Sequence, residues 1–196
     1  RTFINGGLNY TDIQSTQEYN FEFPNRVPGS DVQVIIKTGA VSNSYTDMDI
    51  LINQTESHRL SYSPINDPTF LVTRDYSKTI TPNNNTINIK MQYRNNGNPS
   101  STAYLDYIRV IASESLIASN KQQFFENLDN QLLGGILEYQ LSQAQSVKEI
   151  WDVTDPQNIQ FKTNNNAPSI SWRTTGTEVR QYVSVVENNI YYIIIS

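Results

Sequence analysis

The chain has 196 residues, a formal net charge of −5 and no cysteine. The acidic balance and the lack of any basic run argue against a nucleic-acid partner, because phosphate binding needs clustered Lys and Arg. Without cysteine, the chain has no disulfide, thiolate metal site or thiol nucleophile of its own. Aromatic residues reach 11%, and their large area can build a core although only 37% of the residues are hydrophobic.

Alternation of apolar and polar residues, the period of a half-buried strand, dominates the first 111 residues. The strand over 103–111 is apolar on both faces, as in a central strand that is covered on two sides. Turn-rich segments with Pro, Asn and Gly separate the strands, and the only histidine, His58, is expected in a solvated polar turn. Strands are predicted over residues 18–23, 31–37, 47–53, 86–93 and 103–111.

The pattern changes after Ile111, where residues 113–133 are expected to hold at most one short helix. No repeat of fixed length is present, which argues against a propeller or a solenoid. The predicted fold is all-β: a jelly-roll-like antiparallel β-sandwich over residues 1–112, then a smaller β-rich module over residues 113–196. Short strands are predicted over residues 134–142, 146–154, 159–163, 169–174 and 180–187.

The ends of the chain carry no recognisable leader and no membrane span. The sequence opens without methionine or a charged-then-apolar segment, and its longest apolar run, residues 191–195, is too short to cross a bilayer. We expect both ends to be cuts from a longer polypeptide.

The segment from Lys148 to Phe161 concentrates a tryptophan, two aspartates and a proline. The pattern predicts a strand, a turn and a returning strand, in which Asp155 accepts backbone N–H groups and Pro156 fixes φ. Trp151 is expected to anchor the first strand. The alternative assigns Asp152 and Asp155 to a bound cation or a carboxylate pair, but calcium needs six to eight oxygen ligands. A structural role is favoured for these four residues.

Two further pairs of residues are candidates for a site. Asp47 and Asp49 share one face of a predicted strand, which indicates either a solvated face or the ligands of a calcium ion, the one cofactor that the sequence suggests. Leu105 and Asp106 lie in an apolar strand, where a partly buried aspartate needs hydrogen-bond or Arg partners. A structural role is favoured for Asp106 over a catalytic one.

Four aromatic residues could together form a platform on which sugars stack, and the alternative is that they fill the core. They are Tyr10, Tyr62, Tyr104 and Trp172. Aromatic side chains in a β-rich chain are mostly buried, so the core is favoured.

Three segments follow one another in an order that resembles a known family: residues 104–108, 124–125 and 150–156. The series is similar to the non-catalytic β region upstream of the catalytic domain in gingipain-like cysteine peptidases. It is most similar to the signal peptidase, or sortase, of the type IX secretion system. The resemblance is good over residues 105–161 and looser over residues 29–196. The last strand, residues 190–196, resembles the first strand of the caspase-like catalytic domain.

The resemblance implies a bacterial protein that is exported to the cell surface, either extracellular or associated with the outer membrane. The nucleophilic cysteine and partner histidine of the family have no counterpart here, since the chain has no Cys and only His58. No catalytic residue is therefore carried over, and the resemblance implies that only a longer parent protein is a cysteine peptidase. Its implied partners are the downstream catalytic domain, packed near residues 191–195, and secreted client proteins.

Two other functions remain open from the sequence. The first is a carbohydrate-binding or adhesion module of a bacterial surface protein, with exposed aromatic side chains on a concave face. The second is a hydrolase that acts through paired carboxylates, which must face each other across a cleft. The sequence offers no compelling carboxylate pair.

Overall fold

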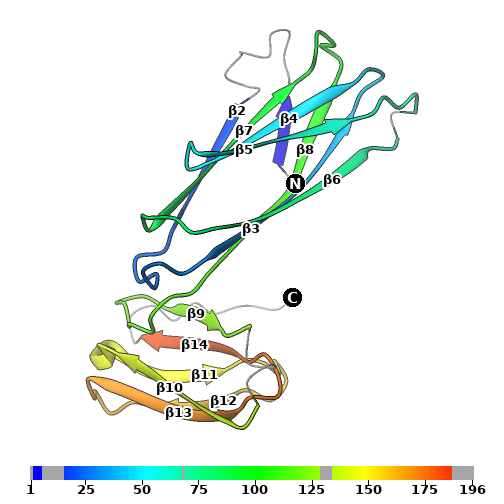
Figure 1. The fold of residues 1–196 in the computed structure, drawn as a ribbon. Helices are drawn as coiled ribbons and strands as arrows, with labels where there is room; N and C mark the ends of the chain where they lie inside the picture. Colours follow the sequence, from blue (N-terminus) through cyan, green and yellow to red (C-terminus); the bar gives the residue numbers. More distant parts are fainter. Residues whose placement is uncertain (1, 6–15, 68, 129–133, 187–196) are drawn as a thin grey trace. The chain divides into compact units, whose positions relative to one another are not determined.

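The computed structural model describes residues 16–67, 69–128 and 134–186, and the backbone of residues 2–5. The chain divides into two compact units, Arg1–Ser115 and Leu116–Ser196. The regular structure is almost entirely β, which confirms the predicted fold class (Figure 1). Among the described residues the helical structure is one short 3-10 turn, η2 (Ala144–Ser146), and no helix is long and apolar enough to cross a membrane. Tyr10 and residues 190–196 lie outside the described part.

The first unit is a sandwich of two four-stranded antiparallel sheets. One sheet has the order β1-β8-β3-β6, and the other has the order β2-β7-β4-β5. Eight strands that alternate between two sheets in this way form a jelly roll. The strands are β1 (Thr2–Asn5), β2 (Thr16–Glu22), β3 (Val32–Val41), β4 (Thr46–Ile52), β5 (Glu56–Tyr62), β6 (Val72–Ile80), β7 (Thr86–Arg94) and β8 (Thr102–Ala112).

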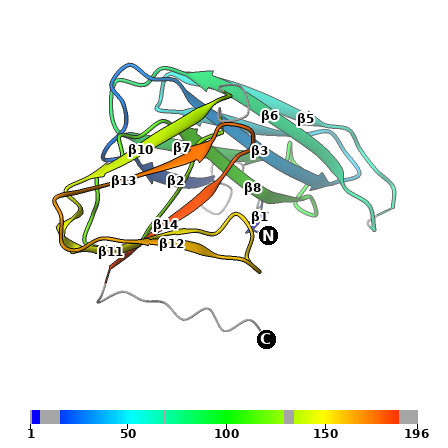
Figure 2. The ribbon, with the colours of Figure 1, turned by 90° about the horizontal axis from the view of Figure 1, so that it is seen from below.

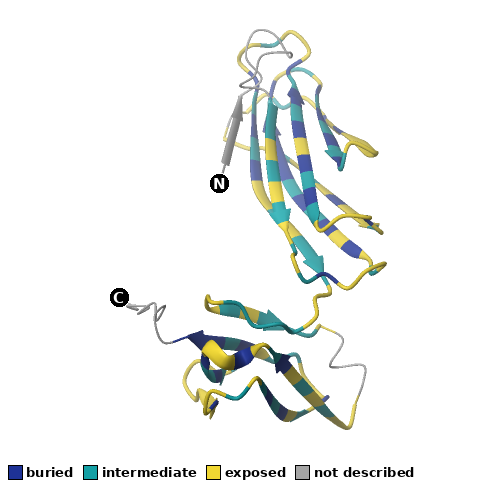
Figure 3. Cartoon of the chain, turned by 90° about the vertical axis from the view of Figure 1, so that its left-hand side faces the viewer, coloured by how far each residue is buried: buried dark blue, intermediate teal, exposed yellow. Residues whose placement is uncertain are grey.

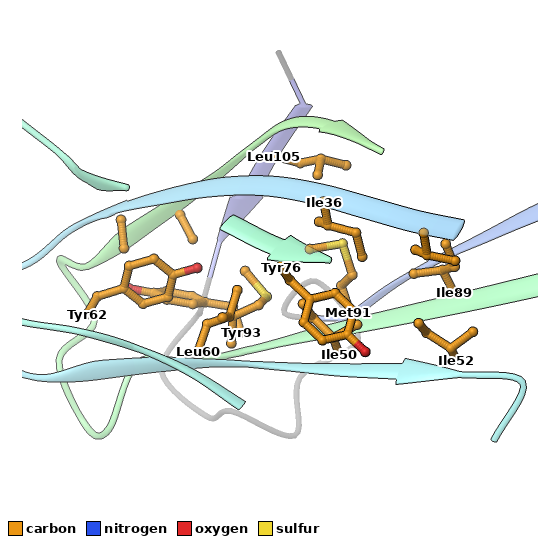
Figure 4. Close-up of a cluster of buried hydrophobic side chains, with 14 of the residues drawn as sticks. Ile36, Ile50, Ile52, Leu60, Tyr62, Tyr76, Ile89, Met91, Tyr93 and Leu105 are labelled. Atoms are coloured by element: carbon orange, nitrogen blue, oxygen red, sulfur yellow. The ribbon is translucent and has the colours of Figure 1, made fainter. Parts of the chain in front are cut away.

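The core of the first unit lies between its two sheets (Figure 4). Every second residue of β4 and β7 is buried there, because successive side chains of a strand point to opposite faces. Figure 3 shows the resulting bands of buried and less buried residues. Tyr62 is fully buried with its hydroxyl 2.6 Å from Thr38 Oγ1, and burial raises the pKa of Tyr62 to about 12.

Strands β5 and β6 lie where the sequence predicts turns or no regular structure. His58 is an exposed residue of β5 rather than of a turn, and its ring stacks on Tyr76 of β6 with 4.9 Å between centroids. The two strands are the edges of their sheets. Because an edge strand buries few side chains, few of its residues need to be apolar, and the alternation of apolar and polar residues in its sequence is weak.

The second unit contains a four-stranded sheet, with the order β12-β11-β14-β9, and the pair β10-β13 (β9 is labelled in Figure 1 and the other five strands in Figure 2). Its core lies between the two sheets and includes Ile150, Ile170 and Trp172. β9 lies within residues 113–133, where the sequence predicts at most one short helix. The strands are β9 (Gln123–Glu126), β10 (Ile136–Ser142), β11 (Val147–Asp152), β12 (Gln160–Thr163), β13 (Ser169–Thr175) and β14 (Gln181–Val186).

Candidate functional site

The segment after Trp151 forms a hydrogen-bonded corner between β11 and β12. Asp155 Oδ1 accepts the backbone N–H of Gln157 at 3.0 Å, and Asp155 O accepts that of Asn158 at 3.0 Å. Pro156 lies between them, at the position of a turn where a fixed φ near −65° fits. Asp155 is exposed and its Oδ1 is used within the turn, so its contacts are those of a structural residue.

Asp152 connects the end of β11 to the start of β14. Its Oδ1 accepts the backbone N–H of Thr154 at 3.1 Å, and its Oδ2 accepts Arg180 Nη1 at 2.8 Å. Burial raises the pKa of Asp152, but the hydrogen bonds from Thr154 and Arg180 outweigh it and hold the pKa below its usual value. Asp152 and Asp155 bind different partners, and neither arrangement pairs them as acid and base or as ligands of one cation.

We expect Asp152→Asn to destabilise the second unit by about 1 kcal/mol at pH 7, because the ion pair and its hydrogen bonds are weakened. A carboxyl group with a depressed folded-state pKa contributes stability above the unfolded pKa, near 3.8, and loses it as the pH falls through the folded pKa. Urea unfolding should therefore show a larger difference between variant and wild type at pH 7 than at pH 2.5.

Glu138→Gln is a matched control for this prediction. Glu138 also pairs with an arginine, Arg173, but both side chains are mostly exposed, at 52% and 70%. An exposed ion pair contributes little, so this variant should unfold like the wild type at both pH values. Equal destabilisation by Asp152→Asn at pH 2.5 and pH 7 would contradict the assignment of the effect to ionised Asp152.

Trp151 does not anchor the core of the second unit. A β-bulge between Val147 and Glu149 shifts the register of β11 against β14, so that Val147 and Ile150 are both buried. Trp151 is half-buried, lies outside the core cluster and donates its Nε1–H to Glu149 Oε2 at 2.6 Å. The core tryptophan is Trp172, which sequence reasoning weighed only as part of a sugar platform or the core.

Asp47 and Asp49 lie on one face of β4, as the alternation predicts, and both carboxylates have protein donors. Burial raises the pKa of Asp49, but the hydrogen bonds that it accepts from Arg59 and Arg94 outweigh this effect and hold the pKa below its usual value. Asp47 accepts Ser61 Oγ at 2.6 Å and Asn96 Nδ2 at 3.0 Å. No group of three or more His, Asp or Glu residues that could hold a metal occurs in the described part of the chain. Calcium binding stays a prediction.

Leu105 and Asp106 have unlike environments in β8. Leu105 is buried in the core, whereas Asp106 is exposed. Asp106 lies at a β-bulge, because the consecutive β3 residues Lys37 and Thr38 pair with Tyr107 and Leu105 and the pairing skips Asp106. The expected partly buried aspartate is therefore not observed. Tyr107 is also exposed, at 45%, so β8 is not covered on two sides along its whole length.

The structure does not gather the four aromatic residues that were candidates for a sugar platform. Tyr62 and Trp172 are buried in different units, and Tyr104 is half-buried on β8. Instead, the exposed aromatic side chains of the second unit include Phe124 and Phe161. Sequence reasoning missed these two residues because they are 37 positions apart and only the strand order brings their strands into one sheet.

Comparison with known proteins finds a solved structure with a similar fold. No family model matches the chain, and no curated protein matches it. The crystal structure of dimeric latent PorU from Porphyromonas gingivalis is similar, with a TM-score of 0.68 and 15% sequence identity over 92% of this chain. The match spans 18% of that PorU chain. At this identity the likeness shows a PorU-like β fold and no more.

Proposed function

We propose that the chain is a non-catalytic accessory β region of a gingipain-like peptidase related to the type IX secretion sortase. Its role would be to pack against the catalytic domain or to dock secreted client proteins at the cell surface. The observation that carries the proposal is the PorU-like fold over 92% of the chain, since PorU is a gingipain-like sortase of type IX secretion. The order of segments 104–108, 124–125 and 150–156 supports the same family.

The chemistry of the side chains is compatible with a non-catalytic role. A cysteine peptidase needs a thiolate and an adjacent base, and this sequence has no cysteine. Its one histidine stacks on Tyr76 at an exposed position of the first unit. The carboxylates of Asp49 and Asp152 are engaged by arginines, which lowers their pKa values and makes them poor proton donors at neutral pH.

The proposal is tested by the coding sequence that follows Ser196. We expect it to encode a gingipain-like domain with a nucleophilic cysteine and a histidine. The longer protein should then unfold at a higher temperature than the present chain, as measured by differential scanning calorimetry, because packing against a second domain buries apolar surface.

A fusion of the present chain to an unrelated folded domain of similar size is the control, and its unfolding temperature should equal that of the chain alone. Two outcomes contradict the proposal. One is a coding sequence without such a domain, and the other is hydrolysis of peptide substrates by the purified chain on its own.

A further inference from the structure

One face of the second unit carries a row of four apolar residues, one from each strand of the sheet. Phe161 of β12 faces Trp151 of β11, Trp151 faces Val183 of β14, and Val183 faces Phe124 of β9. Residues directly opposite each other on neighbouring strands project from the same face of a sheet. We call Phe161, Trp151, Val183 and Phe124 the aromatic row.

The aromatic row lies on the face opposite to the core. The adjacent residues of the same strands, Ile150 and Tyr182, are buried against β10 and β13, so the row points the other way. Phe161 is 66% exposed and Phe124 is 59% exposed, although both are large apolar side chains. Exposed apolar side chains that lie together in this way mark an interaction site.

Hydrogen-bonding groups border the aromatic row on both sides, except at the β14 position that faces Glu149, where the residue is the buried Val185. Glu149 and Thr163, which face each other, lie two residues before Trp151 and two after Phe161. On the other side Gln181 faces Glu126, and Gln181 Nε2 donates to Glu126 Oε2 at 3.3 Å. The carboxylate of Glu149 accepts the indole N–H of Trp151 with one oxygen. That bond satisfies the polar edge of the indole.

The charge on this face is negative at the strand positions that share it. They include two carboxylates, those of Glu149 and Glu126, and no Lys or Arg. Lys162 of β12 points to the other side, where its Nζ donates to the carbonyl of Ser171 in β13. An anionic ligand such as a nucleic acid or an acidic glycan would be repelled.

The chemistry of a sugar fits both the exposed aromatic row and the carboxylates at its borders. The C–H faces of a pyranose ring pack on aromatic rings, and its hydroxyl groups donate to carboxylates and amide oxygens. Four strands spaced by 4.7–4.9 Å make the row about 14 Å long, which is the length of a short oligosaccharide.

We propose that the aromatic row binds a neutral oligosaccharide, with Phe161, Trp151 and Phe124 packed on its rings. Glu149 and Glu126 accept hydrogen bonds from the hydroxyl groups at its two borders. This inference does not depend on the function proposed above, because an accessory region of a peptidase and a free-standing module could equally carry such a site.

The test uses the purified chain and four defined probes: cellohexaose, laminarihexaose, xylohexaose and mannohexaose. We expect at least one of them to bind in isothermal titration calorimetry. Phe161→Ser and Phe124→Ser should each weaken that binding about tenfold or more, since each removes one packed ring. Hexagalacturonic acid should bind more weakly than the neutral probe because it adds negative charge next to Glu149 and Glu126.

Phe70→Ser is the matched control, because Phe70 is also 66% exposed but lies in the first unit. It should leave the affinity unchanged. Circular dichroism of each variant separates a loss of binding from a loss of fold.

Three results would overturn the proposal. The first is no binding of any neutral probe at millimolar concentration. The second is equal loss of affinity in Phe70→Ser and Phe161→Ser. The third is self-association of the chain that Phe124→Ser and Phe161→Ser abolish, because a second copy would then cover the row.

Discussion

Trp172→Ala is expected to destabilise the second unit by about 3–5 kcal/mol, the range for removing a large aromatic side chain from a core. Trp172 contacts three other rings, with centroids at 5.4 Å for Tyr139, 5.8 Å for Phe125 and 5.3 Å for Tyr182. A folded domain is stable by only about 5–15 kcal/mol, so the unit loses a large part of its stability. The first unit should keep its own stability, because the two core clusters share no residue.

Trp151→Ala is the matched control for this change. It removes the same side chain from a half-buried position outside the core cluster, together with the cross-strand pairs with Phe161 and Val183 and one hydrogen bond to Glu149. We expect a loss of about 1 kcal/mol. Hydrogen exchange read by mass spectrometry should show faster exchange in β13 and β14 of Trp172→Ala and no change in β3. Equal effects of the two variants would contradict the assignment of Trp172 to the core.

Asn164→Ala is expected to cost the second unit about 2–3 kcal/mol, although Asn164 lies in a loop. Its side chain is buried, with Nδ2 at 2.7 Å from Ala144 O and 3.1 Å from Val147 O. Its Oδ1 accepts the backbone N–H of Ala167 at 3.1 Å. Removing the amide deletes these three hydrogen bonds, each of which contributes about 0.5–1.5 kcal/mol, although Ala144 O keeps the bond from the backbone N–H of Val147.

Two variants make this prediction specific. Asn165→Ala changes the exposed neighbour and should alter the free energy of unfolding by about 0.5 kcal/mol or less. Asn164→Asp keeps the shape but places a carboxylate next to two carbonyl oxygens, so it should be less stable at pH 7 than at pH 4. Urea unfolding of the three variants measures these differences. A loss in Asn164→Ala no larger than in Asn165→Ala would contradict the role of the buried amide.

The prediction of strands from alternation succeeded where each strand separates a core from solvent. β4 and β7 bury every second residue, so their apolar positions are visible as a period of two. β5 buries only Leu60 and Tyr62, and β6 only Tyr76, so their sequences are mostly polar and the strands were not predicted. β5 pairs with β4 and β6 pairs with β3, so backbone hydrogen bonds hold both strands in their sheets although their sequences alternate weakly.

The candidate site residues were predicted less well than the strands. The turn at Asp155 and Pro156 depends on local backbone chemistry, and the structure places a turn there. The environment of Trp151 depends on a bulge in the pairing with β14, a strand some 30 residues away. Alternation within β11 alone places Val147 and Trp151 on one face, whereas the bulge separates them.

By itself the sequence determined that this chain is built of strands, that it has no thiol chemistry, and that the chain turns at Asp155 and Pro156. Those properties follow from residue type and from neighbours a few positions apart. Only the tertiary structure decided which strands lie side by side, and therefore that Phe124, Trp151, Val183 and Phe161 form one exposed row. The reason is physical: the order and register of strands are set by contacts between distant segments, which no local pattern encodes.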